Sequence, residues 1–283
     1  MNNPHSKKIQ AKEYKPKVTS NTSWGSVATW YDSHLKDDST YHAKVILPSL
    51  LRLLGDVQGK HILDLACGQG YFAKAFKEKK AHVIGVDISK ELIALAEKEQ
   101  EKSGIHASQK VMYFATPSHD LYMVKDKSQD LVVCVLALQN IENIHATIQE
   151  VTRTLKQGGK FIFVINHPAF RIPKESGWGY DEQEHKQYRR IDAYLSESKV
   201  KMDMTPGSTH DKKFTISFHR PLQYWFKILG KNGFAVTRME EWESHKESEK
   251  GPRQAAENKA RKEIPLFLMV EAIFFVKIKE QIK

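Results

Sequence analysis

The stretch ILDLACGQGYFA, residues 62–73, determines the fold that the sequence predicts. Its first half is a short apolar run, which is typical of a buried strand, and its second half begins a helical pattern. Gly68 and Gly70 stand between the two halves, where glycine allows a tight turn and lets a ligand approach the backbone without meeting a Cβ atom. A strand, a glycine turn and a helix in this order predict a ligand site at the turn.

A second stretch, VIGVDIS at residues 83–89, ends the next predicted strand on an acid. This acid is Asp87, seventeen residues after Gly70. An acid at that position can accept hydrogen bonds from the hydroxyls of a ribose. The glycine turn and the acid together therefore indicate a ligand that contains a nucleoside.

Outward from this unit, apolar strands alternate with amphipathic helices, which is the pattern of βαβ units in a parallel sheet. Ser89 is a suitable N-cap for the second helix, and Gly104 stands where that helix should end. The residues therefore predict the α/β fold class. The expected strands cover 62–66, 82–87, 111–115, 131–138 and 160–166, and the expected helices cover 71–79, 89–103 and 145–156.

The segments on either side of this core break the alternation. Residues 21–57 predict a helical N-terminal cover, which Pro48 kinks or divides. Residues 168–213 are polar and rich in aromatic residues, and they predict an insertion that serves as a lid over the substrate. Within it, residues 186–190 together with Asp192 carry charges of both signs and predict a solvated helix rather than an RNA-binding groove. The remaining expected elements are a strand at 214–218, a helix at 221–231, and strands at 234–242 and 266–278, which form an antiparallel pair at the sheet edge.

The composition bounds the class of protein. A chain of 283 residues that is 40% hydrophobic and 28% charged is typical of a globular protein, which excludes overall disorder and a disulfide scaffold. We expect one domain over residues 21–283 and a flexible basic tail over residues 1–20. Cys67 and Cys134 lie in apolar runs and are expected to be thiols in a reducing compartment. Without an apolar leader or a run of about 20 apolar residues, a cytoplasmic location and no membrane span are expected.

The charge raises the possibility of an acidic partner. The net charge is +10, and five lysines lie in the first seventeen residues. No signature of an RNA-binding module accompanies them, so RNA is the alternative partner and a small molecule the main one. Binding to RNA with a steep salt dependence would favour the alternative.

The glycine turn alone is compatible with two classes of cofactor. The spacing of Gly68, Gly70 and Ala73 satisfies the dinucleotide fingerprint, so an NAD-dependent oxidoreductase is one alternative. Asp64 argues against it, because a carboxylate beside this helix N-terminus would repel a pyrophosphate. A cationic cofactor would instead be attracted by both Asp64 and Asp87.

With these features the sequence resembles the class I S-adenosylmethionine-dependent methyltransferases, especially the small-molecule group similar to the ubiquinone- and menaquinone-biosynthesis methyltransferases. Four motifs in order carry the resemblance: LDLACGQG at 63–70, VIGVDIS at 83–89, DLVVCVLALQNIEN at 130–143 and TLKQGGKFIFVINH at 154–167. The resemblance implies a Rossmann-like, doubly wound sheet of about seven strands, mostly parallel with an antiparallel edge strand, and with helices on both faces.

The resemblance also implies the cofactor S-adenosyl-L-methionine and the product S-adenosyl-L-homocysteine. No metal is expected, because Cys67 and Cys134 lack the spacing of metal ligands and the histidines are scattered. Asp64 would lie near the amino group of the cofactor, Asp87 would hold its ribose, and Ile88 would pack on its adenine. The family often places an acid in the loop after the third strand, whereas here Asp120 stands late in that loop. The full expected set is Asp64, Ala66, Cys67, Gly68, Gly70, Asp87, Ile88, Ala115, Thr116, Leu136, Ala137 and Gln139.

Methyl transfer from a sulfonium is an in-line displacement, so aligning the acceptor and excluding water supply much of the acceleration. A general base is needed only when the acceptor loses a proton. His167 and His219 are candidates because both follow predicted strands, and Arg220 would orient an anionic or carbonyl group. The alternative is that His167 caps its strand and Arg220 pairs with an acid of the insertion. The expected substrate residues are Tyr31, Tyr41, His42 and Asn166.

The function that the sequence predicts is methyl transfer to a small-molecule acceptor by a monomer or a homodimer. Three alternatives remain open. The chain could methylate RNA, could be an NAD-dependent oxidoreductase, or could bind S-adenosylmethionine without turnover, since a fold does not guarantee a function.

Overall fold

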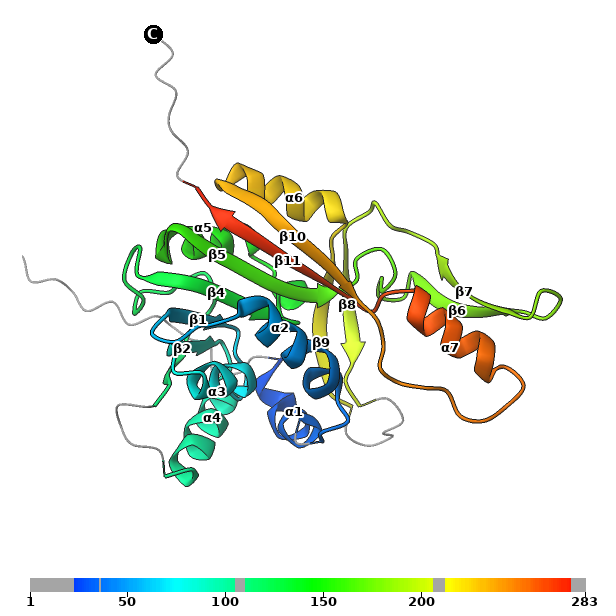
Figure 1. Cartoon of the computed structure of the whole chain (residues 1–283), viewed down its shortest axis with the longest axis horizontal. Helices are drawn as coiled ribbons and strands as arrows, with labels where there is room; N and C mark the ends of the chain where they lie inside the picture. The colour runs from blue at the N-terminus through cyan, green and yellow to red at the C-terminus, as the bar shows by residue number, and fades with distance from the viewer. Residues whose placement is uncertain (1–22, 36, 105–109, 206–211, 276–283) are drawn as a thin grey trace, which may run out of the picture.

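The computed structural model describes residues 23–35, 37–104, 110–205 and 212–275, so the expected basic tail lies outside the described residues. Its centre is a seven-stranded sheet in the order β10-β11-β5-β4-β1-β2-β3, with helices on both faces (Figure 1). The predicted parallel strands are confirmed as β1 (His61–Leu65), β2 (His82–Asp87), β3 (Met112–Ala115), β4 (Gln129–Val135) and β5 (Leu155–Asn166).

The predicted helices are also confirmed, and their ends show why they form where they do. The Ser89 hydroxyl accepts a hydrogen bond from the Leu92 amide at 3.2 Å, which caps the N-terminus of α4. Gly104 adopts a left-handed φ of 64° just after this helix. The helices along the core are α3 (Tyr71–Glu78), α4 (Lys90–Lys102), α5 (Ile144–Thr154) and α6 (Leu222–Lys231).

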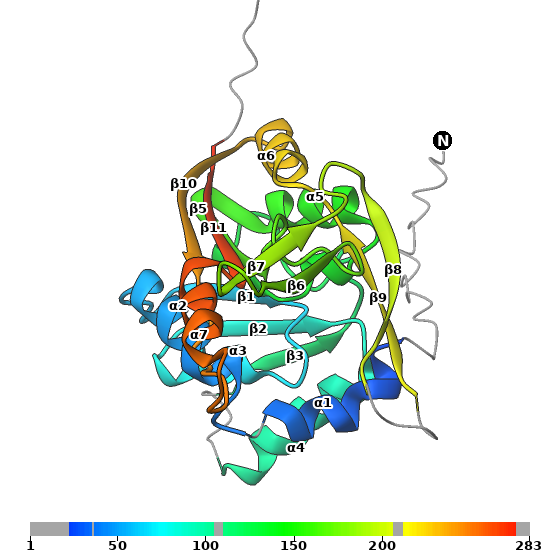
Figure 2. The ribbon, with the colours of Figure 1, turned by 90° about the vertical axis from the view of Figure 1, so that its right-hand side faces the viewer.

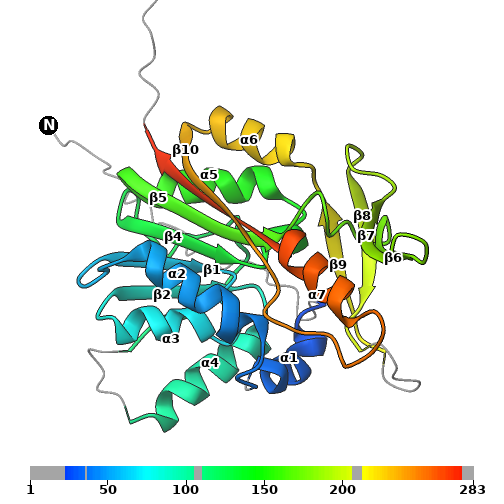
Figure 3. The ribbon, with the colours of Figure 1, turned by 45° about the vertical axis from the view of Figure 1, so that its right-hand side comes forward.

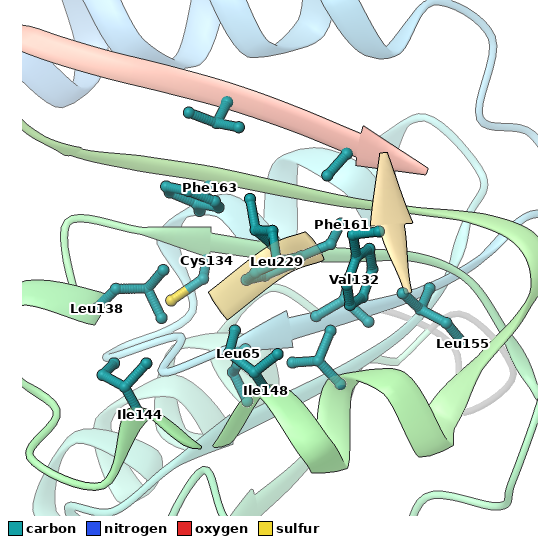
Figure 4. Packing of buried hydrophobic residues seen from close by; sticks show 14 of the residues in the cluster. Leu65, Val132, Cys134, Leu138, Ile144, Ile148, Leu155, Phe161, Phe163 and Leu229 are labelled. Carbon is teal, nitrogen blue, oxygen red and sulfur yellow. The ribbon is translucent and has the colours of Figure 1, made fainter. Parts of the chain in front are cut away.

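The sheet is covered by a hydrophobic layer on each face. On one face Phe161 and Phe163 of β5 pack against Ile148 of α5 and Leu229 of α6 (Figure 4). On the other face Phe76 of α3 packs with residues of β1, β2 and β4. Both layers hold the strands rigidly, so the carboxyl ends of the parallel strands form a fixed edge.

The predicted antiparallel pair at the sheet edge is confirmed. β10 (Phe234–Trp242) pairs antiparallel with β11 (Phe267–Phe274), and β11 pairs antiparallel with β5. The strand that runs against the others is therefore β11, and β10 is the outermost strand on that side.

The N-terminal cover consists of short helical segments. A 3₁₀ turn at Gly25–Val27 leads into α1 (Ala28–Leu35), and a π-helical segment, His42–Ile46, leads into α2 (Leu47–Leu54). Pro48 lies in the first turn of α2, where a missing backbone N–H is tolerated. No described helix is long and apolar enough to cross a bilayer.

The insertion forms two hairpins at the carboxyl ends of the parallel strands (Figures 1 and 2). β6 (Ser176–Asp181) pairs with β7 (Lys186–Ile191), and β8 (Ser198–Asp203) pairs with β9 (Phe214–His219). The prediction of a solvated helix at residues 186–190 is wrong. Both faces of β7 are largely polar, so the sequence lacks the apolar alternation that indicates a strand, and pairing with β6 decides the structure.

The segment between β10 and β11 also contains a helix, α7 (Gln254–Glu263). It packs against β7, far from it in the sequence (Figure 3). Half of its residues are charged and only Ala260 is buried, which explains why no apolar helix is visible in this part of the sequence.

Candidate cofactor and active site

A cavity of about 560 Å³ opens at the carboxyl ends of β1 to β4. Open α/β sheets bind their ligands at this edge, and small-molecule sites span roughly 300–1,000 Å³. The loops after the four strands form its floor, and the N-terminal cover closes it from the side. The walls include Trp24, Tyr31, His42, Asp64, Ala66, Cys67, Gly68, Gln69, Asp87, Ile88, Thr116, Pro117, Ser118, His119, Leu136, Ala137, Asn140, Ile141, Glu142 and Asn143.

The backbone is strained where two neighbouring strands enter the cavity. Ala66 follows β1 with a φ of 59°, and Leu136 follows β4 with a φ of 51°. Left-handed conformations cost non-glycine residues about 1–2 kcal/mol, and such residues cluster at functional sites. Gly68 and Gly70, also at positive φ, complete the turn after β1. These backbones turn the chain away from the sheet and leave space above it.

Asp87 ties the glycine turn to the end of β2. One of its carboxylate oxygens accepts a hydrogen bond from the Gly68 amide at 2.9 Å, and the other accepts one from the Ser89 amide at 2.8 Å. Burial raises the pKa of Asp87 to about 6, although these amides and that of Ile88 favour the charged form. Asp87 is thus a buried acid that is poised near neutral pH.

Asp64 is the most unusual side chain in the cavity wall. It is 1% exposed, and its Oδ2 atom has no hydrogen-bond partner among the described residues. Burial raises its pKa to about 7; the Ala73 amide opposes the shift, and the nearby charge of Asp87 adds to it. Neither acid forms an ion pair with a described residue. Two buried acids without a cation among the described residues would be compensated by a cationic ligand.

Aromatic side chains of the N-terminal cover form the opposite wall. The Tyr31 hydroxyl lies 3.3 Å from Nε2 of His42, and Trp24 packs edge-on against Tyr31 with 5.7 Å between ring centroids. The His42 ring also contacts Tyr71 and Phe72. Burial raises the pKa of Tyr31, so its hydroxyl is neutral. This wall can enclose a flat or apolar group.

The loop after β4 is held from behind by Arg220. Nη2 of Arg220 donates to the carbonyls of Ile141 at 3.0 Å and Glu142 at 3.2 Å, and Nη1 donates to that of Leu138 at 3.5 Å. Arg220 is buried and does not itself line the large cavity. Lys199 of β8 pairs with Glu142 at 2.8 Å on the same loop.

Comparison with known proteins agrees with this geometry. Residues 63–163 match the family described as a methyltransferase domain. The chain is 27% identical over 138 residues to a ubiquinone biosynthesis O-methyltransferase of Bordetella avium, and 29% identical over 154 residues to an uncharacterized protein of Haemophilus influenzae. These matches cover 48% and 54% of the chain, and 55% and 60% of those two relatives.

Solved structures extend the likeness over most of the fold. An S-adenosylmethionine-dependent methyltransferase from Mesorhizobium loti superposes with a TM-score of 0.64 and 27% identity, covering 83% of this chain and 99% of the other. Residues 63–163 are thus similar to a methyltransferase domain. The fold of the chain is the Rossmann-like sheet of the S-adenosylmethionine-dependent methyltransferases, as the sequence resemblance predicts.

The structure brings together most of the expected cofactor residues and separates the expected catalytic ones from them. Two expected substrate residues, Tyr31 and His42, also line the large cavity. Among the expected residues, those that do not line it are Gly70, Ala115, Gln139, Tyr41, Asn166, His167, His219 and Arg220.

Each of the two expected bases has another task. Nε2 of His167 lies 2.7 Å from Glu241 of β10, and its Nδ1 accepts hydrogen bonds from the Ala169 and Phe170 amides. His167 therefore caps the end of β5, as in the alternative interpretation. Nε2 of His219 lies 2.7 Å from the Tyr194 carbonyl oxygen. Arg220 binds carbonyl groups, and no acid in the described part of the insertion forms an ion pair with it.

Several residues that line the large cavity were not predicted from the sequence. Pro117, Ser118 and His119 follow β3, and their position directly after a predicted strand was an available signal. Trp24 had no such signal, because its place depends on how the N-terminal cover folds back.

Burial raises the pKa of the two free thiols, Cys67 and Cys134, so neither is an activated nucleophile. The described residues contain no cluster of three metal-binding side chains.

Proposed function

We propose that this chain transfers a methyl group from S-adenosylmethionine to a small-molecule acceptor. The observation that carries the proposal is Asp64, a buried acid with an unpaired oxygen in the wall of a cavity at the glycine turn. An unpaired buried carboxylate is costly unless a ligand supplies a cation and a hydrogen-bond donor. The ammonium group of the cofactor's amino acid supplies both.

The other walls suit the remaining parts of the cofactor. Asp87 would accept hydrogen bonds from the ribose hydroxyls, because its carboxylate lies at the end of β2 beside the glycine turn. Ile88 is apolar yet 39% exposed and lines the cavity, so it offers a surface for adenine. The pyrophosphate of NAD would meet two acids, which argues against the oxidoreductase alternative.

When bound, S-adenosylmethionine supplies an electrophilic methyl group on a positively charged sulfur. The chain's part is to hold the acceptor in line with that methyl group and to exclude water, which the aromatic wall of Trp24, Tyr31 and His42 favours. An acceptor hydroxyl or amine must also lose a proton. His42 and His119 line the cavity, so they are better placed to receive it than His167 or His219.

The small-molecule class is supported by the size of the cavity and by the wall that encloses it. A ubiquinone biosynthesis O-methyltransferase among the relatives agrees with this class. This chain matches only 55% of the length of that relative, so the main support for a small-molecule acceptor is the cavity itself.

Calorimetric titration with S-adenosylmethionine, S-adenosylhomocysteine and NAD tests the proposal. We expect micromolar binding of the first two ligands and none of NAD. Asp87→Asn should abolish the binding, whereas the control Glu101→Gln, which removes an exposed charge from α4, should leave it unchanged. Binding of NAD alone would establish the oxidoreductase alternative, and binding of none of the three would refute a nucleoside cofactor.

A further inference from the structure

Arg171, which lies just beyond the end of β5, is a partly buried cation whose side chain has no hydrogen-bond or ion-pair partner among the described residues. A guanidinium has five N–H donors. None of those of Arg171 is hydrogen-bonded to a described residue, and its Nε atom is fully buried. Burial and the positive charges of Arg189 and Arg261 lower the pKa of Arg171 to about 10, so it is still a cation at neutral pH. Such an arrangement is unfavourable unless an anion compensates it.

The three arginines of this cluster come from separate parts of the chain. Arg171 and Arg189 of β7 lie against the same ring, that of Trp178 in β6, at 5.8 and 5.2 Å from its centroid. Arg261 comes from α7, which packs against β7. Arg189 also donates to the Phe170 carbonyl at 2.7 Å and to the Ser176 hydroxyl at 2.9 Å, so its position is fixed.

The acids of the hairpin do not neutralise this cluster. Glu182 pairs with Arg253, Glu184 pairs with Lys186, and Asp192 pairs with Arg190. Of the two other acids between residues 175 and 192, Asp181 accepts hydrogen bonds from two backbone amides of the turn, and Glu175 forms no ion pair with a described residue. No described carboxylate forms an ion pair with Arg171, Arg189 or Arg261.

The cluster lies next to the proposed active site. Arg171 lines a small cavity of about 30 Å³ together with Gln139 and Trp225. This cavity has room for a water molecule, and Gln139 Oε1 and Trp225 Nε1 are further unpaired atoms of its walls. Asn140, the residue after Gln139, lines the large cavity. One short loop therefore separates Arg171 from the cofactor cavity.

We propose that Arg171, with Arg189 and Arg261 beside it, binds an oxyanion of the methyl acceptor, a carboxylate or a phosphate. The planar fork of a guanidinium matches either group with two parallel hydrogen bonds. Arg220, the residue that the sequence suggests for orienting an anionic group, uses its fork on loop carbonyls. The guanidinium of Arg171, in contrast, donates no hydrogen bond to a described residue, so its donors are available to an anion. The assignment to the acceptor rests on the proposed methyltransferase function.

A small anion fits this site better than a nucleic acid. Between residues 175 and 192 the hairpin carries five acids against three lysines and arginines. A polyanion that approached Arg171 would meet those acids, whereas a single carboxylate or phosphate would not.

The experiment follows the Arg171 Nε–H signal by NMR in ¹⁵N-labelled full-length protein saturated with S-adenosylhomocysteine. Benzoate, phenyl phosphate and the neutral isostere benzamide are titrated separately, and so is a short single-stranded RNA. We expect a saturable shift with benzoate or phenyl phosphate, and none with benzamide or RNA. Whichever anion binds more tightly identifies the oxyanion.

Three variants sharpen the result. Arg171→Met should weaken anion binding, measured by calorimetry, about tenfold or more and should not lower the thermal unfolding midpoint, because it removes an uncompensated charge. Arg171→Lys keeps the charge but loses the fork, so it should also bind anions more weakly. The control Arg190→Ala removes an exposed arginine of the same hairpin and should change nothing.

Failure of this inference and failure of the proposed function are distinguishable. If S-adenosylhomocysteine itself does not bind, the proposed function fails. If it binds but neither anion shifts the Arg171 signal, or if benzamide binds equally well, the oxyanion site is refuted. A loss of stability in Arg171→Met without loss of anion binding would assign Arg171 a structural role only, and a shift caused by RNA alone would assign the cluster to a nucleic acid.

Discussion

Asp64 shows how the environment of one side chain links stability to binding. Its pKa is about 7 in the fold against an ordinary 3.8, so the folded state holds its proton more tightly than the unfolded state. The contribution of Asp64 to the free energy of unfolding is therefore complete below pH 4 and is lost as the pH rises through 7. At neutral pH the ligand-free protein carries an unfavourable charge at the site where a cationic ligand is needed.

Asp64→Asn should therefore stabilise the ligand-free protein at pH 8. We expect the thermal unfolding midpoint to rise by several degrees there, since each kcal/mol corresponds to roughly 2–4 °C in a chain of this size. The gain should shrink towards pH 3, where the wild-type acid is largely protonated in both the folded and the unfolded state. Scanning calorimetry at the two pH values measures the difference, and an equal gain at both would disprove the linkage.

Cofactor affinity should depend on pH for the same reason. A cationic ligand favours the ionised forms of Asp64 and Asp87, whose pKa values are about 7 and about 6. Affinity for S-adenosylmethionine should rise from pH 5.5 and level off near pH 8, and binding near pH 6.5 should release protons. Calorimetry in buffers of different ionisation heat measures that release. A flat profile would argue against both acids as its source, and a release that is undiminished in Asp64→Asn would argue against Asp64.

At the scale of elements, Arg220 positions the loop after β4 without touching the cavity. Its side chain donates hydrogen bonds to three carbonyl groups of that loop, those of Leu138, Ile141 and Glu142. We expect Arg220→Ala to lower the free energy of unfolding by about 2–4 kcal/mol and to weaken cofactor binding. Urea denaturation and calorimetry measure the two effects. If cofactor affinity were unchanged in Arg220→Ala, the loop would not depend on this contact.

His167 fastens the end of β5 to β10. Burial lowers the pKa of His167 despite the Glu241 contact, so the ring is neutral in the fold and its contribution to stability is lost as the pH falls below 6.5. His167→Ala should cost about 1–3 kcal/mol of stability at pH 7.5 and leave the pH profile of turnover unchanged. A profile that lost its acidic limb would restore His167 as the general base.

Elements with a strong hydrophobic period could be predicted from the sequence, and elements without one could not. The strands β1, β2 and β5 and the cap at Ser89 follow from local patterns. The strand β7 does not, because both of its faces are polar and only pairing with β6 defines it. The position of His167 after β5 was foreseen, but the direction of its ring is set by Glu241, 74 residues away.

At the scale of the whole molecule, the proposed site is assembled from parts of the chain that are distant in sequence. The glycine turn, Asp64 and Asp87 lie in the first two βαβ units and were predictable as a group. The aromatic wall comes from the N-terminal cover and the arginine cluster from the insertion and α7. Their meeting at one edge of the sheet depends on tertiary packing, for which a single sequence contains no local signal.

The most direct test of the central claim is whether Asp64 recognises the amino group of the cofactor. S-adenosylhomocysteine carries that group, whereas 5′-methylthioadenosine keeps the ribose and adenine but lacks the amino acid. Calorimetry at pH 8 should show that Asp64→Asn weakens S-adenosylhomocysteine about tenfold or more and leaves 5′-methylthioadenosine within about twofold. Equal weakening of both ligands, or no weakening of either, would contradict the account.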